Sequence, residues 1–186
     1  MKYLEIDVSV LRNLFDYYPD TGRLIWKFRP LNHFSRESSW KRWNTRYAGK
    51  EAGTVQSKGY ISVILTINGK EKAFKAHRII WALVTGDWPS DQIDHVNVNA
   101  ADNRLVNLRE ATHAENQQNS NVFNTNKLGV KGVHQNPAGK YIAAISSKYI
   151  GIFDTVEDAA KAYDSEVLIL FGEFARTNDT KMTKPV

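Results

Sequence analysis

The sequence lacks cysteine altogether, so it cannot form disulfide bonds or a zinc site built from cysteine ligands. Long apolar runs are also missing, since the longest, such as residues 79–84 and 167–171, are too short to span a bilayer. We therefore expect no membrane partner, and the lack of cysteine fits a reducing cytoplasm. Acidic residues are outnumbered, with 20 Asp and Glu against 25 Lys and Arg. The resulting net charge of +5 suits an anionic partner, although a mild basic excess is also common in proteins that bind no anion.

Residues 94–119 are rich in Asp, Asn and His, which bind metals or hold other side chains in place. Asp94 and His95 follow an apolar residue, so we expect them at the end of a short strand. A polar stretch then predicts a turn, and apolar residues beyond it predict a second strand. Thr112 and Glu115 have the spacing of a capping box, which marks the start of a helix. The segment therefore predicts a strand, an ordered loop, a second strand and a short helix.

This order would bring Asp94, His95, Asn107 and Asn116 together. A carboxylate and an amide oxygen are hard ligands suited to Mg²⁺, and a neutral histidine beside them can accept a proton from water. These are the components of metal-assisted phosphodiester hydrolysis. The alternative is a surface hairpin whose Asn residues form turns through local hydrogen bonds. The residue types alone leave both interpretations open.

The same segment resembles the ββα-metal core of HNH endonucleases, in particular those of phage homing endonucleases. The matching pieces are Ala76-His77-Arg78, Asp94-His95, Asp102-Asn103-Arg104, Asn107-Leu108-Arg109, Thr112 and Glu115-Asn116. The resemblance implies that His95 is the general base and that Asn107 orients it. It also implies that Asp94 and Asn116 bind Mg²⁺ or Mn²⁺. His77 is a further catalytic candidate, although a histidine at a helix start is more often a cap or a buried hydrogen-bonding residue.

Residues 1–89 are predicted to contact DNA and to lead into the nuclease core, which we place at residues 76–119. Between residues 26 and 50, basic side chains alternate with aromatic ones, a pattern typical of nucleic-acid contact. The predicted contacts here are Lys27, Arg29, Lys41, Arg42 and Arg46. The alternative is an irregular loop that tryptophans anchor to the core, because residues 33–47 show no strong pattern of their own. We further expect a strand at 59–66, a hairpin turn at Asn68-Gly69 and a helix at 77–85. Residues 8–89 resemble the leader that precedes phage HNH cores.

An Asn-rich segment at residues 120–127 is predicted to be a flexible linker. Residues 128–178 predict three short strands and a helix that Thr155 caps, and residues 179–186 are predicted to be a tail. We expect the helix to pack through Ala159, Ala160, Tyr163, Val167, Leu168 and Phe171.

This second module resembles the plant ethylene-response-factor DNA-binding domain. The matching pieces include Gly132-Val133-His134, Gly139-Lys140-Tyr141, Ile150-Gly151-Ile152-Phe153 and Ala159-Ala160-Lys161-Ala162-Tyr163-Asp164. The sheet would present DNA contacts outward, namely Lys131, His134, Asn136 and Lys140. The Arg and Trp residues with which the plant family reads bases are missing here, so we expect the module to add affinity and spacing more than base choice.

The sequence thus predicts an α+β protein with a ββα-metal core, a β-rich leader, and a small three-stranded antiparallel sheet packed on one helix. Its resemblances imply a metal-dependent, site-selective DNA endonuclease. We expect it to act as a monomer on double-stranded DNA, to nick one strand, and to work in the cytoplasm of a phage host. The alternative is a DNA-binding regulator with a degenerate nuclease core.

Overall fold

The computed structural model describes residues 6–67, 69–122 and 126–178, and the chain divides into two compact units, Met1–Glu110 and Ala111–Val186. The helices and strands before the division are α1 (Val8–Leu14), β1 (Phe15–Tyr18), β2 (Arg23–Trp26), η1 (Leu31–His33), α2 (Glu37–Tyr47), β3 (Thr54–Val55), β4 (Ile61–Ile67), β5 (Lys70–Lys75), α3 (Ala76–Thr85), β6 (Gln92–His95) and η2 (Leu105–Asn107). The strand β7 (Leu108–Ala111) crosses the division, because its last residue belongs to the second unit. Those that follow are α4 (His113–Gln118), β8 (Val133–Gln135), β9 (Tyr141–Ile145), β10 (Lys148–Phe153), α5 (Val156–Phe171) and η3 (Gly172–Phe174).

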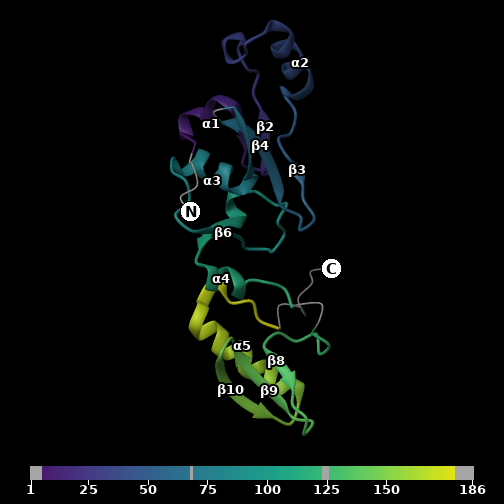
Figure 1. The fold of residues 1–186 in the computed structure, drawn as a ribbon. Helices are drawn as coiled ribbons and strands as arrows, with labels where there is room; N and C mark the ends of the chain where they lie inside the picture. The colour runs from purple at the N-terminus through teal and green to yellow at the C-terminus, as the bar shows by residue number, and fades with distance from the viewer. Residues whose placement is uncertain (1–5, 68, 123–125, 179–186) are drawn as a thin grey trace. The chain divides into compact units, whose positions relative to one another are not determined.

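An apolar core joins the helices and sheets of the first unit. α3 packs against α1, β4 and β5 (Figure 1). Leu11, Val63, Ile79 and Ile80 have no exposed surface, and burying each such side chain contributes about 1.5–3 kcal/mol. The helix predicted at residues 77–85 is therefore confirmed as α3. The predicted hairpin turn at Asn68-Gly69 lies partly outside the described residues, because Asn68 is not among them.

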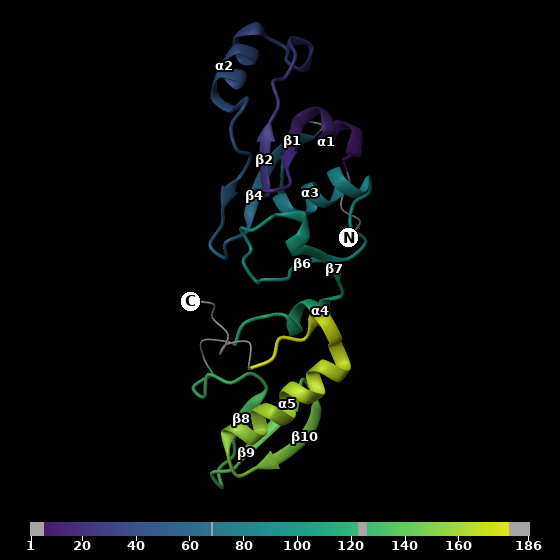
Figure 2. The same cartoon turned by 180° about the vertical axis from the view of Figure 1, so that it is seen from behind.

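Most of residues 33–47, where an irregular loop was the alternative, form the helix α2, which projects beyond α1, β4 and α3 in Figures 1 and 2. One side of α2 carries Trp40, Trp43 and Tyr47, which are three and then four positions apart and so share a helix face. The ring centroid of Trp43 lies 5.3 Å from those of both Trp26 and Tyr47. The helix thus packs on an aromatic cluster of its own. The sequence did not predict this helix because basic residues separate the aromatic ones and obscure their helical spacing.

The segment that resembles the nuclease core has the predicted order of elements. β6 and β7 form a two-stranded sheet, η2 lies between them in the sequence, and α4 follows β7. The capping box of α4 is confirmed: the N–H of Glu115 donates to Oγ1 of Thr112 at 3.3 Å, and the N–H of Thr112 donates to the Glu115 carboxylate at 2.7 Å. The division between the units falls inside the predicted core of residues 76–119. The predicted domain boundaries themselves stay predictions.

In the second unit, α5 lies across one face of the antiparallel sheet β10-β9-β8 (Figure 2). The three strands, the helix and its Thr155 cap are confirmed. Leu168 was expected in the buried stripe but is 51% exposed. The buried residues Ala159, Tyr163 and Val167 follow each other at intervals of four, and Leu168 lies about 100° around the helix from Val167. The stripe is therefore narrower than predicted.

The predicted α+β class is confirmed by this mixture of helices and small sheets. Within the described ranges, no helix combines the length and the apolar character that crossing a membrane requires.

Candidate active site

His95 is the last residue of β6, and only 4% of it is exposed. Its Nε2 lies 3.0 Å from Oδ1 of Asn103, which is itself 1% exposed. With that oxygen as the acceptor, the imidazole carries its proton on Nε2 and its lone pair on Nδ1. Burial lowers the pKa of His95, and the hydrogen bond to Asn103 and the carboxylates of Asp94 and Asp102 oppose this only in part. The imidazole is therefore neutral at physiological pH, which is the form that accepts a proton.

Asn107, predicted to orient His95, instead holds the loop that follows it. Its Oδ1 accepts a hydrogen bond from the N–H of Asn97 at 2.9 Å, and its Nδ2 donates to the carbonyl of Asp102 at 2.8 Å. The structure places the hydrogen bond to the imidazole on Asn103 rather than on Asn107. Asn107 therefore acts on His95 indirectly, by fixing the backbone of the loop.

His77 and Tyr60 surround the imidazole of His95. The ring centroids of the two histidines are 5.0 Å apart, and Tyr60 lies 5.5 Å from His77 and 5.8 Å from His95. The Nδ1 atom of His77 is buried and has no hydrogen-bond partner. Burial lowers the pKa of His77 to about 3, and the positive charges of neighbouring groups contribute to the same lowering. His77 is thus a neutral ring beside the proposed base, and its catalytic role stays a prediction.

Asp94 is buried beside Arg109, which lies on the neighbouring strand β7. Nε of Arg109 donates to Oδ2 of Asp94 at 2.9 Å, and Nη2 forms an ion pair with the same oxygen, also at 2.9 Å. The side chain of Asp94 is 4% exposed and that of Arg109 is 15% exposed. Removing one partner of such a buried pair leaves an uncompensated charge, so the two side chains hold each other in place. Arg109 therefore fixes the orientation of the predicted metal ligand.

The second predicted metal ligand lies in the other unit. Asn116 is on α4, whereas Asp94 is on β6. Their pairing as metal ligands stays a prediction. A carboxylate oxygen and an amide oxygen have the donor chemistry that Mg²⁺ and Mn²⁺ prefer. In the part of the chain that the structure describes, no group of three or more His, Cys, Asp or Glu side chains could hold a metal ion. A cation at Asp94 would therefore need amide, phosphate or water oxygens to complete its ligands.

Two basic residues predicted to contact DNA in the first unit are engaged within the protein. Nζ of Lys27 forms an ion pair with Asp16 at 3.2 Å. The guanidinium of Arg29 lies 4.8 Å from the ring centroid of Phe34 and 4.9 Å from that of Trp43. Its Nε is buried without a hydrogen-bond partner. Arg29 is therefore part of the aromatic cluster that supports α2.

The other three predicted contacts lie exposed on α2. Lys41 pairs with Glu37 at 2.7 Å, one helical turn away. Arg42 and Arg46 form no ion pair with any residue that the structure describes, and the guanidinium of Arg46 lies 5.2 Å from the ring centroid of Tyr47. The helix therefore presents two arginines to solvent.

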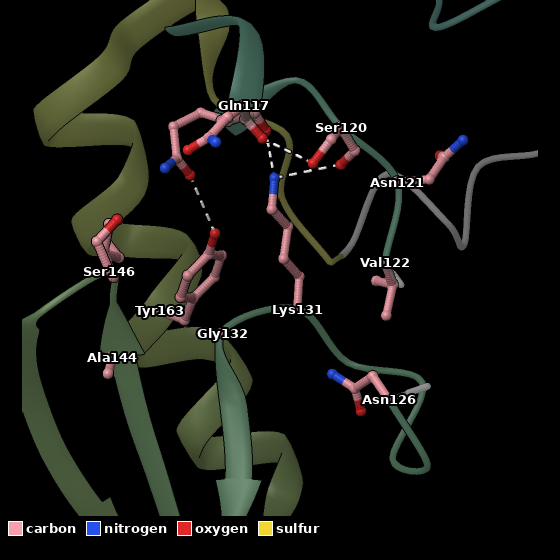
Figure 3. A pocket seen from close by; sticks show the side chains of 12 residues that line it. Gln117, Ser120, Asn121, Val122, Asn126, Lys131, Gly132, Ala144, Ser146 and Tyr163 are labelled. Carbon is pink, nitrogen blue, oxygen red and sulfur yellow. Dashed lines mark hydrogen bonds between the residues drawn. The ribbon is translucent and has the colours of Figure 1, made fainter. Parts of the chain in front are cut away.

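In the second unit, Lys131 was expected to face outward, but its amine turns toward the end of α4 (Figure 3). Nζ donates to the carbonyls of Gln118 and, at 3.2 Å, of Ser120. The hydroxyl of Tyr163 donates to Oε1 of Gln118 at 3.3 Å. These residues help to line a pocket of about 350 Å³ within the second unit. Burial lowers the pKa of Lys131 to about 8. The chain before the predicted linker at 120–127 is therefore tied to the module after it.

The other predicted contacts of this module also differ in their surroundings. Oδ1 of Asn136 accepts a hydrogen bond from the N–H of Lys140 at 3.0 Å and closes the turn before β9. Nζ of Lys140 pairs with Asp154 at 2.7 Å. His134 is exposed and pairs with Ile142 across the strands, on the sheet face away from the buried Val133. Of this group, His134 and Lys140 keep the exposed position that the sequence predicted.

Sequence reasoning gave no role to Asn103, Arg109 or Tyr60. The first two lie in the motif pieces themselves, but their spacing does not show which of several Asn residues meets the imidazole. Tyr60 precedes β4, and no local pattern connects it to His95. Only the packing of distant segments brings Tyr60 to the site.

Residues 74–118 match the model of the HNH endonuclease family. This segment contains all five predicted catalytic and metal-binding residues, namely His77, Asp94, His95, Asn107 and Asn116. The resemblance that the sequence motifs indicated is therefore confirmed over these residues.

An uncharacterised HNH endonuclease of Acanthamoeba polyphaga mimivirus, L560, is 36% identical to this chain over 108 residues, which is 55% of this chain and 56% of the viral protein. The ethylene-responsive transcription factor ERN1 of Medicago truncatula is 40% identical over 67 residues, or 33% of this chain and 24% of the plant protein. The chain thus spans about half of the viral relative and about a quarter of the plant one. The second predicted resemblance is confirmed by the plant match.

A solved structure that describes DNA binding and cleavage by the HNH homing endonuclease I-HmuI covers 89% of this chain and 90% of its own. Its sequence is 19% identical and its TM-score is 0.40. At these values the likeness carries no argument about fold or activity.

Proposed function

We propose that the protein is a metal-dependent, site-selective DNA endonuclease that hydrolyses a phosphodiester bond. The observation that carries the proposal is the setting of His95. It is buried, neutral and hydrogen-bonded through Nε2, at the end of a strand within the segment that matches the HNH endonuclease model. The viral relative, which is described as an HNH endonuclease, supports the same activity.

In this proposal His95 is the general base. Its Nε2–H is held by Asn103, so the lone pair on Nδ1 takes the proton from the attacking water. A general base of this kind typically contributes about 10²–10⁴-fold in rate. Tyr60 and His77 pack on the ring and restrict its rotation, so the imidazole needs little reorientation before the proton transfer. His77 is neutral, so it places no positive charge beside the base.

Asp94 and Asn116 are the proposed ligands for Mg²⁺ or Mn²⁺. A bound divalent cation supplies stabilisation of the charge that develops on the phosphate and the leaving oxygen. Arg109 holds Oδ2 of Asp94, and so presents the carboxylate in one orientation. The guanidinium also balances part of the negative charge that a carboxylate and a phosphate bring together.

Double-stranded DNA is the proposed partner, and the exposed arginines of α2 support it because they can neutralise phosphates. One nuclease core in the chain cuts one strand, so a monomer would nick its substrate. The alternative, a DNA-binding regulator with a degenerate core, draws support from the match to a plant transcription factor. The buried and oriented His95 favours the endonuclease.

The test is nicking of supercoiled plasmid in Mg²⁺, comparing wild type with His95→Ala and with His33→Ala as a matched control. His33 is exposed in η1, outside the proposed site. We expect His95→Ala to lower the cleavage rate by about 10²–10⁴-fold while DNA affinity stays the same, because phosphate contacts elsewhere carry binding. His33→Ala should cleave as wild type does.

Three outcomes would count against the proposal. Wild-type protein that binds DNA but never relaxes it would support the regulator. Equal loss of binding and cleavage in His95→Ala would make His95 structural. Full activity in EDTA would exclude the metal ligands proposed here.

A further inference from the structure

Tyr17 connects the N-terminal hairpin to the loop that orients His95. It lies on β1, and its hydroxyl donates to the carbonyl of Asn103 at 3.1 Å while it accepts from the N–H of Leu105 at 2.8 Å. One phenol therefore satisfies two backbone groups on either side of Arg104. A hydroxyl can do this because it is at once a donor and an acceptor.

A second contact lies at the turn of the same hairpin. Gly22 packs so closely on the loop that a Cβ atom there would lie 2.5 Å from the backbone nitrogen of Arg104 and 2.6 Å from the carbonyl carbon of Asn103. Its φ of 70° is also one that glycine adopts without strain. The β1–β2 hairpin thus holds the backbone of residues 103–105 at two places, Tyr17 and Gly22.

This backbone matters because it carries the side chain that holds the base. Oδ1 of Asn103 lies 3.0 Å from Nε2 of His95, and Asn103 is almost wholly buried. A hydrogen bond weakens steeply when its angle or length departs from the preferred range. A small movement of the Asn103 backbone would therefore loosen the ring and change which nitrogen bears the proton.

We propose that Tyr17 is a positioning residue for the reaction, which holds Asn103 so that Asn103 in turn fixes the tautomer and orientation of His95. This inference rests on the proposed nuclease function. It gives the N-terminal region a part in the chemistry in addition to DNA contact. Burial raises the pKa of Tyr17, so the hydroxyl keeps the proton that it donates to Asn103.

The test compares Tyr17→Phe with Tyr18→Phe, which removes the same atom from the next residue. Tyr18 is 53% exposed and forms no part of the site. For Tyr17→Phe we expect kcat to fall by about 10- to 100-fold, with KM and DNA affinity within about twofold of wild type, because misplacing a catalytic group costs rate rather than binding. Tyr18→Phe should behave as wild type does.

A spectroscopic arm makes the result independent of cleavage. In protein labelled with ¹⁵N at histidine, the His95 signals, assigned by their loss in His95→Ala, should show the Nε2–H tautomer in wild type and in Tyr18→Phe. They should show a mixture of tautomers in Tyr17→Phe. Even if the wild type cleaves no DNA, so that the proposed function fails, this arm still decides whether Tyr17 positions His95.

A double-mutant cycle with Asn103→Ala separates positioning from general stability. If Tyr17 acts through Asn103, then Tyr17→Phe should change kcat little further once Asn103 is absent. An additive loss of kcat in the cycle, or an unchanged His95 tautomer in Tyr17→Phe, would overturn the proposal. So would an equal loss of activity in Tyr18→Phe.

Discussion

The ionisable side chains around His95 in the first unit and the surface lysines of the second unit lie in different surroundings. In the first unit His77, Asp94 and His95 are each no more than 5% exposed, and the two imidazoles are in contact. In the second unit Lys140 and Lys148 instead pair with carboxylates at the protein surface. Burial changes the protonation of a group and so its chemistry, whereas a surface ion pair mainly reduces the local net charge.

Basic residues in the sequence do not all become positive charge that is available to a binding partner. Arg42 and Arg46 stay exposed on α2. Lys131, Lys140 and Lys148 are each engaged by carbonyls or carboxylates of their own unit. We therefore expect the first unit to supply both the base and most of the phosphate contact.

The largest expected difference between the units is their response to acid. The pKa of His77 falls to about 3 in the folded protein, below its ordinary value of 6.5. The unfolded chain then binds more protons, so stability is lost as pH falls from about 6.5 toward 3. At pH 5 the loss is on the order of 2 kcal/mol. The two histidines of the second unit, His113 and His134, are exposed.

Tryptophan fluorescence can measure this, because all five tryptophans lie before the division. The free energy of unfolding, measured in urea by fluorescence, should be lower at pH 5 than at pH 7. The control is His77→Phe, which keeps a buried ring but removes the titration, and its unfolding should depend less on pH. If the wild-type fluorescence transition did not change over this range, His77 would not be the acid-sensitive group.

A smaller effect is expected when matched pairs of charges are removed. Arg42→Gln with Arg46→Gln should reduce the slope of log Kd against log salt by about 2, since each phosphate contact contributes about 0.9. Lys140→Gln with Lys148→Gln should reduce the slope by less than about 1, because carboxylates already neutralise these amines. Fluorescence anisotropy with one DNA duplex across a salt series gives both slopes. An equal reduction in slope for the two double variants would show that the ion pairs of Lys140 and Lys148 open when DNA binds.

Removing the acidic partners of Lys140 and Lys148 should have the opposite effect on the salt slope. Asp154→Asn and Glu166→Gln release Lys140 and Lys148, so the salt slope should rise by up to about 2. The control is Glu157→Gln, which removes one exposed acid from α5 and releases neither lysine. A rise in slope for the control as large as that for each released lysine would mean that net charge matters and the pairing does not.

The smallest effect concerns one strained backbone position in each unit. Val98 has a φ of 57° and Ser146 a φ of 53°, a left-handed conformation that costs a β-branched residue most. Ser146 begins the two-residue connection between β9 and β10, where glycine suits a positive φ. Val98→Gly should raise the free energy of unfolding by about 1 kcal/mol, and Ser146→Gly by about half as much, since glycine also gains freedom in the unfolded chain. Urea unfolding followed by circular dichroism would measure both, and a loss of stability in Val98→Gly would show that the packing of its side chain outweighs the strain.

Much of the local structure could be predicted from the sequence. The strand, loop, strand and helix around His95, the Thr112 capping box and the helix α3 all depend on residues a few positions apart. α2 was within reach too, because Trp40, Trp43 and Tyr47 have helical spacing. That pattern was obscured because the basic residues between the rings are also what a nucleic-acid contact would require.

The sequence by itself therefore determined the order of the elements and the chemical types gathered in the motif, since caps, turns and periodicity act between near neighbours. Only the tertiary structure decided that Asn103, rather than Asn107, meets His95. It also decided that Lys131 turns inward, and that Tyr17 supports a loop 86 positions away. The physical reason is that such contacts depend on how separate elements pack, and equally plausible side chains in the sequence compete for each of them until packing selects one.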